Sequence, residues 1–268
     1  EPEDPDYKIT VTVNQKERTI VVEDNGMGMT AEEVDEYINQ IAFSGAQDFL
    51  NKYKDKANED QIIGHFGLGF YSAFMVADKV TIDTQSYQAD AAPVHWESEG
   101  GTEFEMRDGD KEGIGTRITL YLNEDSAEFS NEYRAREVIE KYCGFMPFPI
   151  YLVNADAEPQ YETIEKDELT EKDTVVETVV EEEKTEEKEK EDGTKETVVV
   201  SPRKEKYKIL KRPVPLNDTN PLWNKHPNEC TEEEYKAFYR KVFMDYREPL
   251  FWIHLNMDYP FNLKGILY

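Results

Sequence analysis

The chain has 268 residues, enough for one or two hydrophobic cores, and its 58 acidic and 31 basic residues give a net charge of -27. A surface this acidic argues against nucleic acid or an anionic membrane as the main partner, so we expect neither. No apolar run reaches the roughly 18 residues that span a bilayer, and no secretory signal is visible. The cysteines Cys143 and Cys230 lie far apart in sequence, which favours free thiols and a cytoplasmic location.

The first 154 residues predict an α+β fold, a two-layer sandwich of helices on a mixed, mostly antiparallel sheet. Residues 7–13 alternate between apolar and polar, and together with residues 19–22 they predict a hairpin. Thr30 and Glu33 form a capping-box pattern at the start of a helix. A second helix is expected over 130–143, and further strands over 79–84, 93–97, 102–106, 116–122 and 150–153.

Residues 155–206 predict an acidic, disordered linker. Between 162 and 196 there are 16 acidic residues, 6 lysines and no aromatic residue, so the segment buries too little apolar surface to offset its chain entropy. After it, Thr231 and Glu234 predict another capped helix, and strands are expected over 250–255 and 261–268. We predict domains at 1–154 and 207–268. Both are expected to be incomplete, because the chain begins without methionine and ends inside a strand.

The stretch 62–77 carries three glycines in the spacing G-x-x-G-x-G and then an apolar run that predicts a helix over 68–77. Closely spaced glycines let backbone N–H groups approach an anion, and a helix N-terminus attracts one. A phosphate loop is one interpretation, and a glycine-rich turn before a core helix is the other. Phe70 and Tyr71 stand where a Walker loop needs Lys and Ser or Thr, and the glycine order does not fit a dinucleotide fingerprint.

Two further elements combine with this loop. Asp24, Gly26 and Gly28 form D-x-G-x-G at the end of a predicted strand, where a carboxylate can accept a hydrogen bond from an exocyclic amine beside a flat base. Gly115 and Thr116 place a hydroxyl at the start of another strand. The first pattern alone is also a common turn. The three elements in this order predict a split nucleotide pocket, with the base at Asp24 and the phosphates at the glycine loop.

With these motifs the sequence resembles the ninety-kilodalton heat-shock protein (heat shock protein 90) chaperone family, within the superfamily of gyrase, histidine-kinase and mismatch-repair ATPases. The resemblance covers nearly the whole chain, and the pattern F-G-x-G-F-Y-S-A-F at 66–74 is highly specific to the family. Residues 37–45 and 249–255 look most like the bacterial branch, high-temperature protein G. The stretches 220–223, 234–239 and 261–267 resemble the opening of the family's middle domain.

The resemblance implies an ATP-dependent chaperone that closes as a homodimer and remodels unfolded or partly folded client proteins, with ATP or ADP and Mg2+ as cofactors. It places the dimer contact in a C-terminal domain beyond this chain. It also implies that Asp24 binds the adenine amine with support from Thr116, and that a lid spans 41–64. The other implied ATP-binding residues lie beside the base or around the phosphates: Gly28, Met29, Gly64, Phe66, Gly67, Leu68, Gly69 and Phe70.

Three departures from the family pattern affect the expected activity. Phe43 stands where many members carry lysine, and His65 where many carry glutamine. The family's water-positioning glutamate and magnesium-holding asparagine belong to a motif that precedes the start of this chain, and its γ-phosphate arginine lies beyond Tyr268. We therefore assign no catalytic residue and no metal ligand, and expect an ATPase parent of which this chain alone is inactive.

Two other functions remain open. A different superfamily member, such as a histidine kinase or a topoisomerase subunit, lacks an acidic linker that leads to Trp223 and the following helix. A non-catalytic interaction module with a vestigial pocket is favoured only by Phe43 and the missing first motif. His226 and Cys230, four residues apart, resemble half of a metal site, but no second pair accompanies them.

Overall fold

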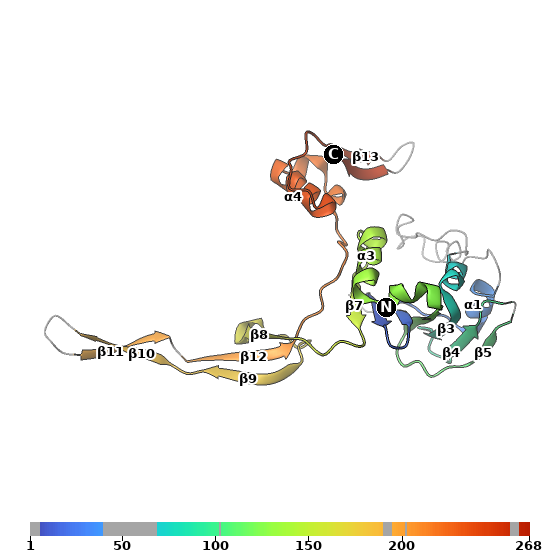
Figure 1. The fold of residues 1–268 in the computed structure, drawn as a ribbon, viewed down its shortest axis with the longest axis horizontal. Helices are drawn as coiled ribbons and strands as arrows, with labels where there is room; N and C mark the ends of the chain where they lie inside the picture. Colours follow the sequence, from blue (N-terminus) through green and yellow to red (C-terminus); the bar gives the residue numbers. More distant parts are fainter. Residues whose placement is uncertain (1–5, 40–68, 102, 190–194, 202, 258–262) are drawn as a thin grey trace. The chain divides into compact units, whose positions relative to one another are not determined.

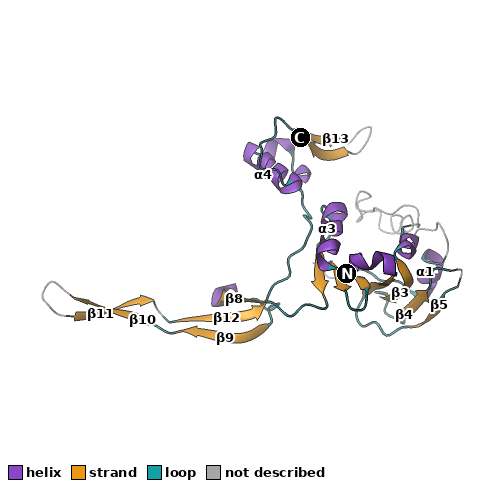
Figure 2. Ribbon diagram, viewed as in Figure 1, coloured by secondary structure: helices purple, strands orange, loops and turns teal. Residues whose placement is uncertain are grey.

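The computed structural model describes residues 6–39, 69–101, 103–189, 195–201, 203–257 and 263–268 (Figure 1). Contacts divide the chain into one unit of residues 1–155 and 215–268 and a second of residues 156–214. Strands outnumber helices (Figure 2), and the predicted α+β fold is confirmed. No helix in the described ranges is long and apolar enough to cross a membrane.

The larger unit is built on a seven-stranded sheet with the order β5-β4-β3-β6-β2-β1-β7. The β1–β7 pair is parallel and the other pairs are antiparallel, and β1 and β2 form the predicted hairpin. The strands are β1 (Ile9–Asn14), β2 (Thr19–Asp24), β3 (Ala77–Gln85), β4 (Val94–Ser98), β5 (Glu105–Asp108), β6 (Gly115–Leu122) and β7 (Ile150–Asn154).

Two capped helices belong to this sheet. Helix α1 (Ala31–Tyr37) begins at the predicted capping box: the Glu33 N–H donates to Thr30 Oγ1, and the Thr30 N–H donates to Glu33 Oε2. Helix α3 (Glu132–Cys143) begins after Asn131, whose side chain accepts hydrogen bonds from two N–H groups of the first turn. It contacts the edge strand β7 (Figure 1). Both helix starts therefore satisfy N–H groups that would otherwise lack a partner.

The main core lies between the sheet and the elements that cover one of its faces. Val80 and Ile82 of β3, Val94 and Trp96 of β4 and Val34 of α1 are all buried, and the side chains of the 3-10 helix Phe70–Met75 pack against them. Burying an aliphatic or aromatic side chain of this size stabilises the fold by about 1.5–3 kcal/mol. This cluster fixes α1 and the 3-10 helix against β3, β4 and β6.

Our prediction of an α-helix over 68–77 is wrong. Its described part is the short 3-10 helix Phe70–Met75, in which Met75 is 80% exposed. Strand β3 already begins at Ala77, which pairs with Leu122 of β6, so too little chain remains for an α-helix. A single short 3-10 helix also has little macrodipole, so its N-terminus gives a phosphate little electrostatic attraction.

The smaller unit contains strands where we expected a disordered linker, so that prediction is wrong for these segments. A three-stranded sheet has the order β8-β12-β9, and β10 pairs with β11 as a hairpin. Strand β12 also crosses the predicted boundary at 206/207. The strands are β8 (Tyr161–Glu165), β9 (Val175–Glu181), β10 (Lys184–Glu189), β11 (Lys195–Ser201) and β12 (Lys204–Leu210).

Charge pairing and a small apolar face explain these strands. Lys206 in the central strand β12 lies 3.6 Å from Glu165 of β8 and 3.0 Å from Glu181 of β9. On the opposite face of β12, Ile209 is fully buried and Ile164 of β8 is 8% exposed. The prediction failed because it weighed charge along the chain, whereas the sheet matches the acids of two strands with the lysines of a third.

The C-terminal part of the larger unit contains helix α4 (Glu232–Phe243) and the hairpin β13 (Ile253–Met257) and β14 (Leu263–Leu267). The predicted capping box of Thr231 and Glu234 is present at the start of α4. His226 Nδ1 accepts a hydrogen bond from the Asn228 N–H at 3.2 Å, and Cys230 Sγ donates to the His226 carbonyl. These two residues therefore stabilise a local turn.

Candidate functional site

Asp24, Thr116 and Thr84 form a row across three neighbouring strands. Asp24 of β2 pairs with Thr116 of β6, and Thr116 pairs with Thr84 of β3. Because side chains alternate along a strand, this row shares its face with the buried Ile82 two residues earlier in β3. Thr84 Oγ1 lies 3.0 Å from Thr116 Oγ1, and both side chains are buried. The row is thus the polar end of the helix-covered face.

The Asp24 carboxylate is partly buried at the end of β2. Its Oδ1 accepts a hydrogen bond from the Gly26 N–H at 2.8 Å, and the Thr116 N–H also donates to it. Burial raises the pKa of Asp24 above its usual value and Glu23 adds to the rise, whereas the two hydrogen bonds and the charge of Lys111 oppose it. A carboxylate offers about four lone-pair sites, so Asp24 retains capacity to accept a donor from a ligand.

The bend after Asp24 is clamped against the end of β3. Gly28 has φ +64°, and a Cβ there would lie 1.9 Å from the Gln85 carbonyl oxygen, so no other residue fits. The Met29 N–H donates to Thr84 Oγ1 at 2.9 Å. Thr84 therefore holds the bend against the strand that carries the polar row, and the backbone of Gly28 and Met29 lies beside Asp24.

The Gly115-Thr116 motif meets Asp24 for a steric reason. Gly115 has φ +128°, and a Cβ there would lie 2.1 Å from the Asp24 carbonyl oxygen. Only glycine lets β6 begin this close to the end of β2. The structure thus brings together Asp24, Gly28, Met29 and Thr116, four residues that the sequence analysis placed around a base.

Phe70 and Gly69 are the described residues of the glycine loop. The Phe70 ring lies 5.6 Å from the Trp96 ring and packs against the same core cluster as Met29. A Cβ on Gly69 would meet nothing within 4 Å among the described residues, so its neighbours leave open space at this position. The remaining predicted residues lie outside the described ranges, together with the lid at 41–64: Gly64, Phe66, Gly67, Leu68, Phe43 and His65.

Sequence reasoning missed Thr84 and the charged residues behind the row. Arg117 pairs with Glu23 through Nε and Nη2, each at 3.1 Å, and Lys111 Nζ lies 3.3 Å from Glu23 Oε1. Burial raises the pKa of Glu23, but the hydrogen bonds and charges of Arg117 and Lys111 outweigh it and bring that pKa below its usual value. Glu23 and Asp24 point to opposite faces of β2. Only the strand register reveals this arrangement.

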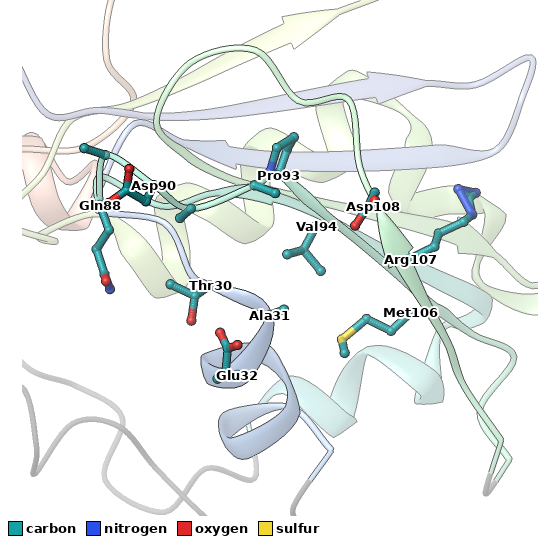
Figure 3. Close-up of a pocket in the computed structure, with 13 residues that line it drawn as sticks. Thr30, Ala31, Glu32, Gln88, Asp90, Pro93, Val94, Met106, Arg107 and Asp108 are labelled. Atoms are coloured by element: carbon teal, nitrogen blue, oxygen red, sulfur yellow. The ribbon is translucent and has the colours of Figure 1, made fainter.

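A cavity beside the start of α1 lies apart from the polar row. A cavity of about 540 Å³ lies between the start of α1, the loop 88–93 and β5 (Figure 3). None of the predicted site residues in the described ranges lines it. Its walls carry the carboxylates of Glu32, Asp90 and Asp108 and one cation, Arg107, so an anionic nucleotide would be repelled there.

The fold is consistent with a class of ATPase domains. The family described as "Histidine kinase-, DNA gyrase B-, and HSP90-like ATPase" matches residues 6–100. The family described as "Hsp90 protein" matches residues 128–268, just over half of the chain. The chain therefore belongs to the Hsp90 protein family.

Bacterial chaperones are similar to the chain along almost its whole length. Chaperone protein HtpG of Bacteroides thetaiotaomicron is 43% identical over 260 residues, which cover 97% of this chain and 31% of the relative. That of Bacteroides fragilis strain 638R is 44% identical with the same coverage, and that of Porphyromonas gingivalis is 40% identical over 98% of this chain and 32% of the relative. The chain thus spans about a third of the length of these relatives.

Proposed function

We propose that this chain is the nucleotide-binding part of an ATP-dependent molecular chaperone, and that the adenine base binds against Asp24, Gly28, Met29 and Thr116. The observation that carries the proposal is the register that puts the Asp24 carboxylate and the Thr116 hydroxyl side by side at the end of a buried face. Membership of the Hsp90 protein family supports it. Residues 1–154 then form the nucleotide domain, and the middle domain begins after the smaller unit, within residues 215–268.

The residues present fit an adenine nucleotide. Asp24 has lone pairs left for an exocyclic amine. The close contact of Gly28 with the Gln85 carbonyl fixes the bend that carries Met29. The Asp24 carboxylate is preorganised for contact with the amine, because the backbone N–H groups of Gly26 and Thr116 already orient it. The open space beside Gly69 suits the phosphate end, with Gly64, Phe66, Gly67, Leu68 and Phe70 completing the cradle in this proposal.

We assign hydrolysis to the whole protein and not to this chain alone. ATP bound with Mg2+ would supply the phosphoryl group, but no group of three or more acidic, His or Cys side chains in the described residues is arranged to hold a metal. Glu23, the carboxylate next to Asp24, is paired with Arg117 and Lys111 on the other face of the sheet. It therefore cannot align a water for attack on a nucleotide at Asp24.

The remaining parts of the proposal concern the parent protein. Its partners would be unfolded or partly folded client proteins and a second copy of itself, joined through a domain outside this chain. Neither nucleic acid nor a membrane is a proposed partner. A cytoplasmic location is supported by Cys143 and Cys230, which are both free thiols.

The test is a calorimetric titration of the 268-residue chain with ADP. We expect saturable binding that Asp24→Ala weakens by about ten- to a hundredfold, the value of one hydrogen bond to a charged group. The matched control is Asp78→Asn, an exposed carboxylate on β3, which should bind like the wild type. Equal affinities for wild type and Asp24→Ala would refute the proposed base site. Magnesium-dependent turnover by this chain would refute the assignment of hydrolysis.

A further inference from the structure

Lys111 is a buried lysine directly behind the proposed nucleotide site. Its side chain is only 4% exposed, although lysine is almost never buried without partners. The ammonium donates to the Gly113 carbonyl at 3.2 Å and the Glu112 carbonyl at 3.5 Å, and it lies 3.3 Å from Glu23 Oε1. Lys111 therefore ties its own loop to the residue that precedes Asp24.

This loop leads straight into the Gly115-Thr116 motif. The carbonyls that Lys111 holds belong to Glu112 and Gly113, and Gly113 has φ +78°. Two residues later Gly115 contacts the Asp24 backbone so closely that a side chain would collide with it. The placement of Thr116 against Asp24 thus depends on a loop whose internal anchor is the Lys111 ammonium.

We propose that Lys111 is a positioning residue of the nucleotide site: its ammonium fastens the loop before Thr116 to β2 and places a positive charge behind the Asp24 carboxylate. This inference rests on the proposed function, because it assigns a role toward the adenine-binding carboxylate. It goes beyond that function in naming a residue that does not touch the nucleotide. Lys111 acts through Asp24 and Thr116 from the opposite face of the sheet.

The charges around Asp24 act on its ionisation in opposite directions. Glu23 is the nearest like charge and opposes ionisation of Asp24, whereas Lys111 favours it. Arg117 of β6 is engaged by Glu23, and Asp83 of β3, next in that charged row, is bonded to His95 at 2.6 Å. The groups that face Asp24 from β3 and β6 on its own side are the neutral hydroxyls of Thr84 and Thr116.

Two substitutions with opposite expected signs test the proposal. Lys111→Met keeps the length of the side chain but removes its charge, and it should raise the pKa of Asp24. Glu23→Gln removes the like charge and should lower that pKa. Both values are read from the carboxyl-carbon NMR signal of Asp24 in the full chain as pH is varied. Lys79→Met, which breaks a similar pair with Glu97 (2.9 Å) elsewhere on β3, is the control and should change nothing.

ADP affinity should depend on the same ionisation of Asp24. The pH at which half of the affinity is lost should move up in Lys111→Met and down in Glu23→Gln. If both variants shift the Asp24 titration in one direction, or neither does, Lys111 has only a structural role and the proposal is overturned. If Lys111→Met does not fold, the second neutral variant Lys111→Gln is tested in the same way. A wild type that binds no ADP would refute the proposed function, while the titration of Asp24 would still test Lys111.

Discussion

The seven-stranded sheet and the sheet β8-β12-β9 each bury an isoleucine almost completely, yet different interactions surround the two residues. Ile82 of β3 is 1% exposed and lies in a cluster of valines, aromatic rings and α1 side chains. Ile209 of β12 is fully buried on a narrow apolar face, and the other face of its strand carries lysines paired with glutamates. Apolar packing thus dominates one sheet, while cross-strand charge pairing is prominent in the other.

This difference explains which segments could be predicted. In the first sheet the alternation of apolar and polar residues is visible in each strand on its own, so its strands appeared near their predicted places. In the second sheet an acidic strand is favourable only when a lysine strand lies beside it, and Lys206 is 41 residues away from Glu165 in the sequence. Composition alone therefore predicted disorder where the pairing forms a sheet.

The largest expected effect comes from replacing the two buried isoleucines, Ile82 and Ile209, by alanine. Ile82→Ala should lower the free energy of unfolding of the larger unit by about 3–5 kcal/mol, because its packed surroundings leave a cavity. Ile209→Ala should cost less, about 2 kcal/mol, and should leave ADP affinity unchanged. All three tryptophans lie in the larger unit, so urea unfolding followed by fluorescence reports on that unit. Hydrogen exchange of the β12 amides reports on the smaller one.

A result in which Ile209→Ala shifts the tryptophan transition as much as Ile82→Ala would contradict this separation. The two units would then unfold as one cooperative body.

An intermediate effect is expected for Thr84→Val, which tests the polar end of the apolar face. The variant keeps the shape of the side chain but leaves the Met29 N–H without its acceptor, a loss of about 1–3 kcal/mol for a buried group. ADP affinity should fall as the bend loosens. Thr81→Val on the same strand is the matched control, since Thr81 is also buried. Thermal unfolding and ADP titration of both variants provide the comparison, and equal effects at the two positions would rule out a special role for Thr84.

The smallest effect is expected for Lys206→Met in the charge-paired sheet. Removing the ammonium between Glu165 and Glu181 should speed amide exchange in β8, β9 and β12 by a few-fold, and added salt should reduce the difference from the wild type. Lys166→Met is the control, because the Lys166 side chain is 72% exposed. If salt leaves the difference unchanged, charge pairing does not stabilise this sheet.

The proposed site was predictable in part. Asp24, Gly28 and Thr116 stand in short motifs whose residue types reflect the backbone they need, such as the positive φ of Gly28. Thr84 and Lys111 carry no local signal, because the first lies in an ordinary strand and the second in a polar loop. Their roles arise from the β3–β6–β2 register and from one long side chain, and both depend on contacts between distant parts of the sequence.

The most direct test of the adenine contact at Asp24 is the ratio of ADP to IDP affinity, since IDP carries a carbonyl oxygen where ADP carries the amine. The wild-type chain should prefer ADP by about ten- to a hundredfold, because a carboxylate accepts from an amine and repels a carbonyl. Asp24→Asn, whose amide can donate as well as accept, should lose most of this preference. A wild-type chain that binds the two nucleotides equally, or an Asp24→Asn variant that keeps the full preference, would contradict the account.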